Sequence, residues 1–380
     1  MISNIEEPNS VEILDPKSLY EALEGPDADE WTDAIIAELE AHMENNTWEI
    51  VDLPSNHKPI GVRYVFKTEL TKTGGRERRK ARLVANGFSQ IPGTNFNDTF
   101  APVSRASTIR LMMALSVEMN LIVHQMDVVT AFLNGEVEEK IYITVPEKLE
   151  SLLNEIIKKK ISQSTIQVAE KWLKNLQQGN PKTCRLRKAI YGLRQSGRQW
   201  YIKLDSELKK LGLTPSQADP CLYMLKDEIS TIFLAVYVDD IIIATNNIGI
   251  MENMENIKSD IVKLFKMKDM GAISYCLGIE FQQNLKNGTI TMSQKKFTEE
   301  ILIRFGMENS KPVLTPMDGN QKLKKPETEG TNEEFPYQSL IGSIMYLSVS
   351  TRPDITHATA SSTPTIRKNT GSQQRKFFDT

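Results

Sequence analysis

The sequence has few residues of the kinds that build metal–thiolate centres or disulfide frameworks. Its 380 residues include three cysteines, Cys184, Cys221 and Cys276, which lie far apart, and four scattered histidines. Because there is no Cys-x-x-Cys pair and no histidine cluster, the sequence predicts neither a zinc site nor a disulfide framework. A reducing compartment is therefore favoured.

The sequence also lacks a run of about eighteen apolar residues, which a membrane-spanning helix needs. Its first residues, MISNIEEPNSVEILDP, have neither the basic start nor the apolar stretch of a secretory signal. We therefore expect no membrane partner and no secretion. A hydrophobic content of 40% and a charged content of 25% are typical of a globular protein. The length favours two or three subdomains.

Positive charge is scarce at the start of the chain and abundant after it. Residues 1–54 hold fifteen Asp and Glu against one lysine, Lys17, whereas the remaining residues carry a net charge of +11. Two segments, 63–82 and 182–210, are strongly basic. Such clusters can neutralise a phosphate backbone, although a solvated charged face explains either one alone about equally well.

Two helical pieces are expected within residues 16–46, separated at Gly25-Pro26. In the second piece we expect Asp29 to be the N-cap. Apolar residues at four-residue spacing form a stripe that is typical of a surface helix packed on a core. The stripe consists of Trp31, Ile35, Leu39 and Met43.

Beyond these helices, strand-like and helix-like segments alternate irregularly. Residues 62–88 predict a hairpin with a basic Gly-Gly loop. Further helices are expected at 107–120, 198–212, 250–266, 294–306 and 337–350. This pattern predicts an α+β fold with a largely antiparallel sheet.

The segment AVYVDDIIIAT, residues 235–245, carries two acids between apolar runs. The runs predict central strands, and a two-residue turn would place Asp239 and Asp240 at the tip. Acids are ordinary in turns, so a plain turn is the simpler interpretation of this segment alone. However, Asp127 also ends an apolar strand, IVHQMDVV. Two acid-tipped strands in one sheet would bring three carboxylates to one edge.

Carboxylates without nearby His or Cys suit a hard ion such as Mg²⁺ or Mn²⁺. Two such ions about 4 Å apart can clamp the attacking and leaving oxygens of a phosphoryl transfer. Together with the basic segments, the acids favour a nucleotidyl transferase. A two-metal nuclease is the alternative on chemistry alone.

An ordered set of motifs resembles the reverse transcriptases of copia-type (Pseudoviridae-like) LTR retrotransposons, the polymerase region of a Pol polyprotein. The motifs cover about residues 18–357 and are NTWEIVDLP, YVFKTEL, KARLVANGFSQIPGTNFNDTFAPV, HQMDVVTAFLNGEVEEKIYITVPE, RLRKAIYGLRQSGRQWY, DPCLY, YVDDIIIAT, FKMKDMGAISYCLGIEF and YQSLIGSIMYLSVSTRPDI. The resemblance implies an RNA-directed DNA polymerase that adds dNTPs to a DNA primer on an RNA template.

The resemblance also implies a catalytic site of three acids. Asp127 and Asp239 would bind two Mg²⁺ ions, or Mn²⁺, with the backbone carbonyl of Val128. Asp240 matches a position that is usually acidic but less directly ligated.

Further roles implied by the resemblance concern the incoming nucleotide and the primer. Phe132 would be the steric gate that crowds a ribose 2′-hydroxyl, with a core aromatic as the alternative interpretation. Gly278 lies in a segment similar to the primer-grip hairpin. Residues implied to contact the triphosphate, the template or the incoming base are Lys67, Lys80, Arg82, Tyr191, Gly192 and Gln195.

The resemblance implies a right-hand polymerase with fingers, a palm built on the antiparallel sheet, and a partial thumb. The expected divisions are an acidic helical lead-in at 1–54, a fingers-like region at 55–120, a palm at 121–285 with a helical insertion at 150–182, a thumb-like start at 286–310, a linker at 311–336 and a truncated connection segment at 337–380.

The sequence departs from the family at Ser196-Gly197. After the Gln of YGLRQ the family usually has Ala-Pro or Ser-Pro, so Gly197 stands where a proline is usual. The RNase H and integrase parts of such polyproteins are missing from the sequence, so we expect a part of a longer polyprotein. A virus-like particle in the cytoplasm, or the nucleus, is the expected location. The alternative function is a catalytically inactive remnant that only binds nucleic acid.

Overall fold

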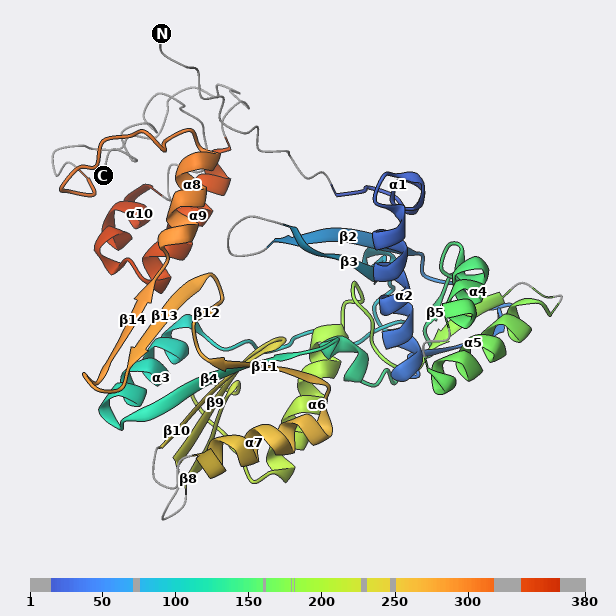
Figure 1. Cartoon of the computed structure of the whole chain (residues 1–380), viewed down its shortest axis with the longest axis horizontal. Coiled ribbons are helices and arrows are strands. Elements are labelled where there is room, and N and C mark those ends of the chain that lie inside the picture. The colour runs from blue at the N-terminus through green and yellow to red at the C-terminus, as the bar shows by residue number, and fades with distance from the viewer. Residues whose placement is uncertain are drawn as a thin grey trace, which may run out of the picture. The chain divides into compact units, whose positions relative to one another are not determined.

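The computed structural model describes residues 15–70, 76–159, 162–178, 180, 182–226, 231–246, 251–317 and 336–362 (Figure 1). The chain forms two compact units. Unit 1 comprises Met1–Pro102 and Val129–Leu211, and unit 2 comprises Val103–Val128 and Gly212–Thr380. Neither unit is a continuous segment, because the chain leaves unit 1 for a single helix and strand and then returns.

Some predicted segments lie outside the described residues. They include the Gly-Gly turn at 71–75, the first fourteen residues of the acidic lead-in and most of the predicted linker.

Unit 1 contains five helices and two antiparallel sheets among its described residues. The helices are α1 Leu19–Glu24, α2 Ala28–Glu44, α4 Leu149–Lys159, α5 Gln163–Leu176 and α6 Ser196–Lys210, with short 3-10 turns at Gly87–Ser89 and Ala131–Asn134. The strands are β1 Trp48–Asp52, β2 Val62–Leu70, β3 Arg76–Ala85, β5 Tyr142–Ile143 and β6 Lys182–Leu186. The sheet orders are β1-β6-β5 and β2-β3.

The predicted break at Gly25-Pro26 is confirmed, because α1 ends at Glu24 and α2 starts at Ala28. The predicted N-cap is wrong. Asp27 precedes the helix, and Asp29 lies in its first turn. A carboxylate there is still favourable, since it faces the positive end of the helix dipole.

The apolar stripe of α2 packs on the β2–β3 hairpin, as its spacing predicts. All four stripe residues are buried. The ring of Trp31 meets that of Phe66 edge-on, with centroids 5.2 Å apart. The Glu38 carboxylate also accepts a hydrogen bond from the backbone N–H of Leu83 at 2.8 Å. One face of the hairpin therefore packs in the core, and the opposite face is available to solvent or ligands.

Unit 2 is built on a six-stranded sheet in the order β11-β4-β10-β9-β8-β7. Its strands are β4 Leu121–Val128, β7 Thr214–Pro215, β8 Leu222–Lys226, β9 Thr231–Tyr237, β10 Asp240–Asn246 and β11 Met267–Ala272; a second sheet holds β12 Tyr275–Cys276, β13 Ile279–Asn284 and β14 Thr289–Ser293. Neighbouring strands in both sheets are antiparallel. The helices are α3 Ala106–Glu118, α7 Met251–Leu264, α8 Lys295–Arg304, α9 Tyr337–Ser350 and α10 Thr356–Ser362.

Both faces of the large sheet are covered, which explains why its central strands are apolar throughout. On one face, Ile109 and Met112 of α3 share a core with Val123 of β4 and Ala244 of β10. On the other face, Lys258 of α7 reaches the side chain of β4 residue His124. The prediction of an α+β fold with antiparallel sheets is therefore confirmed.

Candidate active site

Two of the predicted catalytic acids lie directly opposite each other on neighbouring strands. In the antiparallel register of β10 and β4, Asp240 is paired with Asp127. Side chains of directly opposed residues project from the same face of a sheet. The next residue of β4, Val128, donates its backbone N–H to the carbonyl oxygen of Asp239 at 2.8 Å. The sheet thus brings the three acids to one edge, as the two acid-tipped strands predicted.

The turn itself differs from the prediction by one residue. Its central residues are Val238 and Asp239, whereas Asp240 is the first residue of β10 and pairs with Tyr237 of β9. The prediction that both acids occupy the tip is therefore wrong for Asp240. Val238 has a φ of 56°, which is an outlier for a β-branched residue. A position of this kind normally selects glycine in a tight hairpin turn.

A buried amide that the sequence analysis missed supports Asp240. The side-chain nitrogen of Gln125 donates to Oδ1 of Asp240 at 2.8 Å, and Gln125 is only 6% exposed. Burial raises the pKa of Asp240, and the hydrogen bond from Gln125 opposes that rise. The sequence did contain a sign of this contact. Gln125 is a polar residue in a largely apolar strand, and because it lies two residues before Asp127 it is on the same face of the sheet.

The acidic edge offers oxygen ligands only. Asp127, Asp239 and Asp240 are all half-buried, and Oδ1 of Asp239 is buried. Such a donor set fits a hard divalent cation. Within the described part of the chain, no three His, Cys, Asp or Glu side chains converge as a ready-made metal cluster. Strand register places Asp127 opposite Asp240, but the three acids do not form a closed metal cluster among the described residues.

The three predicted basic contacts share the outward face of the β2–β3 hairpin. Lys67 is paired with Lys80, and Arg82 is paired with Val65. Side chains at these positions lie on the face opposite to the one packed on α2, because neighbouring positions alternate between faces. Lys80 is held by Glu69, with 3.1 Å between Nζ and Oε1. The hairpin therefore presents a basic surface, formed by Lys67, Lys80 and Arg82.

Three predicted residues form one stacked cluster in unit 1. The guanidinium carbon of Arg82 lies 5.2 Å from the ring centroid of Tyr191. That ring meets Phe132 in a tilted arrangement with centroids 4.7 Å apart. Phe132 lies in the 3-10 turn Ala131–Asn134 and is half-buried. We call Arg82, Tyr191 and Phe132 the aromatic cluster.

Gly192 anchors this cluster to the end of β3. The backbone N–H of Ala85 donates to the carbonyl of Tyr191 at 2.8 Å. Gly192 has a φ of 89°, and a Cβ there would lie 2.1 Å from the Ala85 carbonyl oxygen. Such a close approach of two backbone segments requires glycine.

Gln195 lies inside the same region and is 1% exposed. Its amide nitrogen donates to the Asn95 carbonyl at 2.8 Å, and its Oε1 accepts from Gln90 at 3.0 Å. These bonds fix the segment that carries Tyr191. Direct contact between Gln195 and a base stays a prediction. Ser196 starts α6, and its hydroxyl donates to the Ile190 carbonyl at 2.5 Å.

The sequence profile of the family described as reverse transcriptase (RNA-dependent DNA polymerase) matches residues 45–163 and 158–319. The chain therefore belongs to the reverse transcriptase family. The resemblance to copia-type retrotransposon enzymes is confirmed as well.

Two relatives of this chain are Pol polyproteins, of which it matches only a part. The retrovirus-related Pol polyprotein from transposon TNT 1-94 of Nicotiana tabacum is 37% identical over 90% of this chain and 24% of that polyprotein. The corresponding polyprotein from transposon RE1 of Arabidopsis thaliana is 31% identical over 90% of this chain and 21% of its own length. The putative transposon Ty5-1 protein of Saccharomyces cerevisiae is 28% identical over 61% of this chain and 66% of its own length. The chain thus spans about a quarter or less of the two Pol polyproteins. Among the described residues, no helix is both long and apolar enough to cross a membrane.

Proposed function

We propose that this chain is an RNA-directed DNA polymerase that extends a DNA primer on an RNA template with dNTPs. The single observation that carries the proposal is the position of Asp127 directly opposite Asp240 on neighbouring strands. Beside this pair, the backbone carbonyl of Asp239 accepts a hydrogen bond from the N–H of Val128. This arrangement supports a polymerase in a chain that belongs to the reverse transcriptase family.

The acidic edge would hold divalent metal ions through Asp127, Asp239 and the carbonyl of Val128, with Asp240 in support. When bound, Mg²⁺ would supply Lewis-acid activation of the primer 3′-hydroxyl and stabilisation of the leaving pyrophosphate. The protein's own contribution is to fix these ligands. The Gln125 amide holds Asp240 in place, and the hydrogen bond from Val128 holds the Asp239 backbone.

We assign selection of the nucleotide to the aromatic cluster and the basic hairpin face. Lys67, Lys80 and Arg82 would neutralise the triphosphate, because cationic side chains bind phosphate oxygens strongly. Phe132 would exclude a ribose 2′-hydroxyl by steric contact. Tyr191 supports Phe132 from one side, and Gly192 permits the close backbone approach that places Tyr191.

We further propose a right-hand arrangement for the whole chain. In it, residues 55–120 act as fingers, 121–285 as the palm and 286–310 as the start of a thumb. The hairpin around Gly278 would then contact the primer strand. The antiparallel sheet that carries the acids supports the palm assignment.

The test is extension of oligo(dT) on poly(rA) with Mg²⁺, comparing the wild type with Asp239→Asn. We expect the substitution to lower the rate at least about a hundredfold, because it removes a charged metal ligand. Asp260→Asn is the matched control, since the Asp260 side chain is 43% exposed on α7 and pairs with Lys263 one turn further along the same helix. A wild type that extends no faster than Asp239→Asn would overturn the proposal. Salt-sensitive binding of primer–template without extension would instead favour the inactive remnant.

A further inference from the structure

The turn between β12 and β13 is strained and has little support from its own strands. Its two central residues, Leu277 and Gly278, have φ values of 52° and 69°. Both positive values match a type I′ hairpin turn, which favours Asn and Gly rather than Leu. The ladder below it pairs Tyr275 with Glu280 and Cys276 with Ile279. A strained residue of this kind persists only where its surroundings hold it.

A side chain from α9 holds this turn. The hydroxyl of Tyr346 donates a hydrogen bond to the backbone carbonyl of Leu277. Burial raises the pKa of Tyr346, so the hydroxyl keeps its proton and remains a donor. The Tyr346 ring is fixed in turn by Phe297 of α8, edge-on with centroids 5.3 Å apart. Gly278 lies against the same ring, and a Cβ there would be 3.5 Å from the hydroxyl oxygen.

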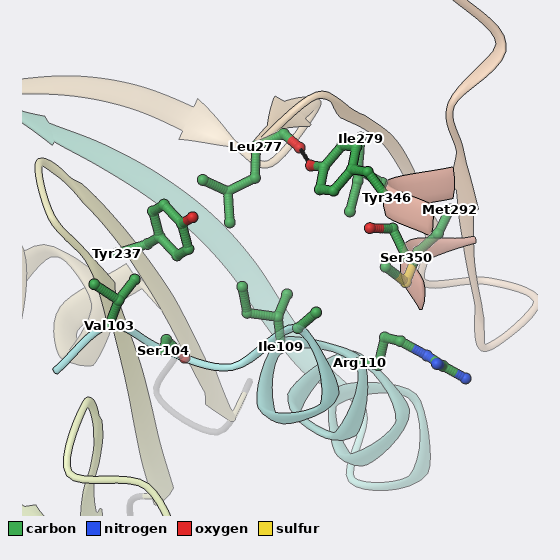
Figure 2. A pocket seen from close by; sticks show the side chains of 11 residues that line it. Val103, Ser104, Ile109, Arg110, Tyr237, Leu277, Ile279, Met292, Tyr346 and Ser350 are labelled. Atoms are coloured by element: carbon green, nitrogen blue, oxygen red, sulfur yellow. Dashed lines mark hydrogen bonds between the residues drawn. The ribbon is translucent and has the colours of Figure 1, made fainter. Parts of the chain in front are cut away.

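The turn and Tyr346 both border a cavity. The cavity has a volume of about 310 Å³, and its lining includes Leu277, Tyr237, Ile109 and Tyr346. Figure 2 shows Leu277 and Tyr237 on the same rim, with Tyr346 bonded to Leu277 from the far side. Tyr237 is the last residue of β9 and directly precedes the Val238–Asp239 turn. Leu277 of the β12–β13 turn and Tyr237 beside the acidic hairpin therefore border the same open space.

We propose that Tyr346 is a positioning residue for the primer strand, acting by holding the strained Leu277–Gly278 turn in place at the border of this cavity. The inference rests on the proposed polymerase function, in which this hairpin contacts the primer. The Leu277 side chain packs at the edge of the hydrophobic core of unit 2, so the Tyr346 hydrogen bond adds a hold on the backbone of the turn. Loss of the Tyr346 hydroxyl would let the strained Leu277 backbone relax, which would shift the turn. The primer contact would then weaken while the acidic hairpin keeps its own hydrogen bonds.

The experiment compares wild type, Tyr346→Phe and Tyr20→Phe in the full chain. Tyr346→Phe keeps the ring packed on Phe297 and removes the hydroxyl that bonds the Leu277 carbonyl. We expect the primer–template KM to rise about threefold to tenfold, as the loss of one hydrogen bond implies. We expect kcat at saturating primer–template to stay unchanged. Tyr20→Phe removes the same atom from the exposed helix α1 and should leave both constants unchanged.

A second variant acts on the turn rather than on the tyrosine. Gly278→Ala adds a Cβ at a φ of 69° and against the Tyr346 ring, so it should also raise KM. Because both changes act through one contact, the double variant should raise KM by less than the product of the single effects.

An unchanged KM in Tyr346→Phe, or a fall in kcat with KM unchanged, would overturn the inference while leaving a functional wild type. A fully multiplicative double variant would also overturn it. A wild type that neither binds nor extends primer–template would overturn the proposed function and this inference together.

Discussion

Gly192 and Ala85 approach so closely that a Cβ on Gly192 would lie 2.1 Å from the Ala85 carbonyl oxygen. Gly192→Ala must therefore push the Tyr191 loop away from β3. We expect the free energy of unfolding of unit 1 to fall by at least about 2 kcal/mol, from overpacking and from the positive φ together. Urea unfolding followed by tryptophan fluorescence measures this, because all four tryptophans lie in unit 1.

Gly93→Ala is the control for this substitution. Gly93 has a φ of 74° but open space around its Cβ position. The free energy of unfolding of Gly93→Ala should therefore fall only because of the positive φ, by about 1 kcal/mol. Equal losses in the two variants would show that the close approach to Ala85 contributes nothing.

Phe132 is the predicted steric gate, and Phe132→Val should relax discrimination between the sugars. We expect the ratio of kcat/KM for dTTP over UTP to fall about tenfold to a hundredfold, which is the range for removing packing against one hydroxyl. Primer extension with each nucleotide alone measures the ratio. Phe100→Val shortens an aromatic side chain that is 74% exposed and should keep the wild-type ratio. A ratio that stays the same in Phe132→Val would make Phe132 a core aromatic.

Val238 stores strain in the acidic hairpin, because its φ is 56°. A non-glycine residue with such a positive φ costs about 1–2 kcal/mol of folding free energy. Glycine removes this cost, but it loses about 0.5–1 kcal/mol more backbone entropy on folding. We expect Val238→Gly to stabilise unit 2 by about 0.5–1 kcal/mol in a urea series read by pulse proteolysis. Val262→Gly, on the exposed side of α7, should have the opposite sign and lose about 0.5 kcal/mol. Destabilisation by Val238→Gly would mean that the turn is not strained.

His124 makes the stability of unit 2 depend on pH. Burial lowers its pKa, and the positive charge of Lys258, whose Nζ lies 2.7 Å from Nδ1, lowers it further; Asp269 and Glu255 oppose both effects. The folded state therefore binds a proton less readily than the unfolded state, whose histidine pKa is about 6.5. Stability contributed by neutral His124 is present above that pH and is lost as pH falls through the lowered pKa.

Replacement by glutamine removes the titrating group and keeps an acceptor for Lys258. We expect His124→Gln to lose less stability than the wild type between about pH 7.5 and 5.5. Pulse proteolysis in urea at each pH measures the difference. His57→Gln, at an exposed position of unit 1, should keep the wild-type slope. If the stability of His124→Gln changed with pH as steeply as that of the wild type, the prediction would be contradicted.

Local sequence patterns predicted much of the fold. The helix predicted at 337–350 is α9, Tyr337–Ser350, and the apolar stripe of α2 is buried as predicted. The sequence also predicted that the two acid-tipped strands share one sheet; their direct pairing as β4 and β10 is seen only in the structure. These features depend on periodicity and turn chemistry, which a single sequence contains.

Contacts between distant segments were beyond the sequence. Gln125 with Asp240 and Tyr346 with Leu277 join residues whose proximity depends on how whole elements pack. The position of the turn was missed for a related reason. Valine at a positive φ contradicts local preference, and only the pairing of β10 with both β4 and β9 imposes it.

Both edges of β4 pair with strands that the ribosome makes much later, since β10 begins at Asp240 and β11 at Met267. During translation Leu121–Val128 therefore emerges as an apolar segment whose native partners do not yet exist. Such non-local pairing slows folding and exposes strand edges to other chains. A transcript interrupted before Asp240 would yield a product that carries Asp127 and Asp239 but lacks both partner strands of β4 and is prone to aggregate.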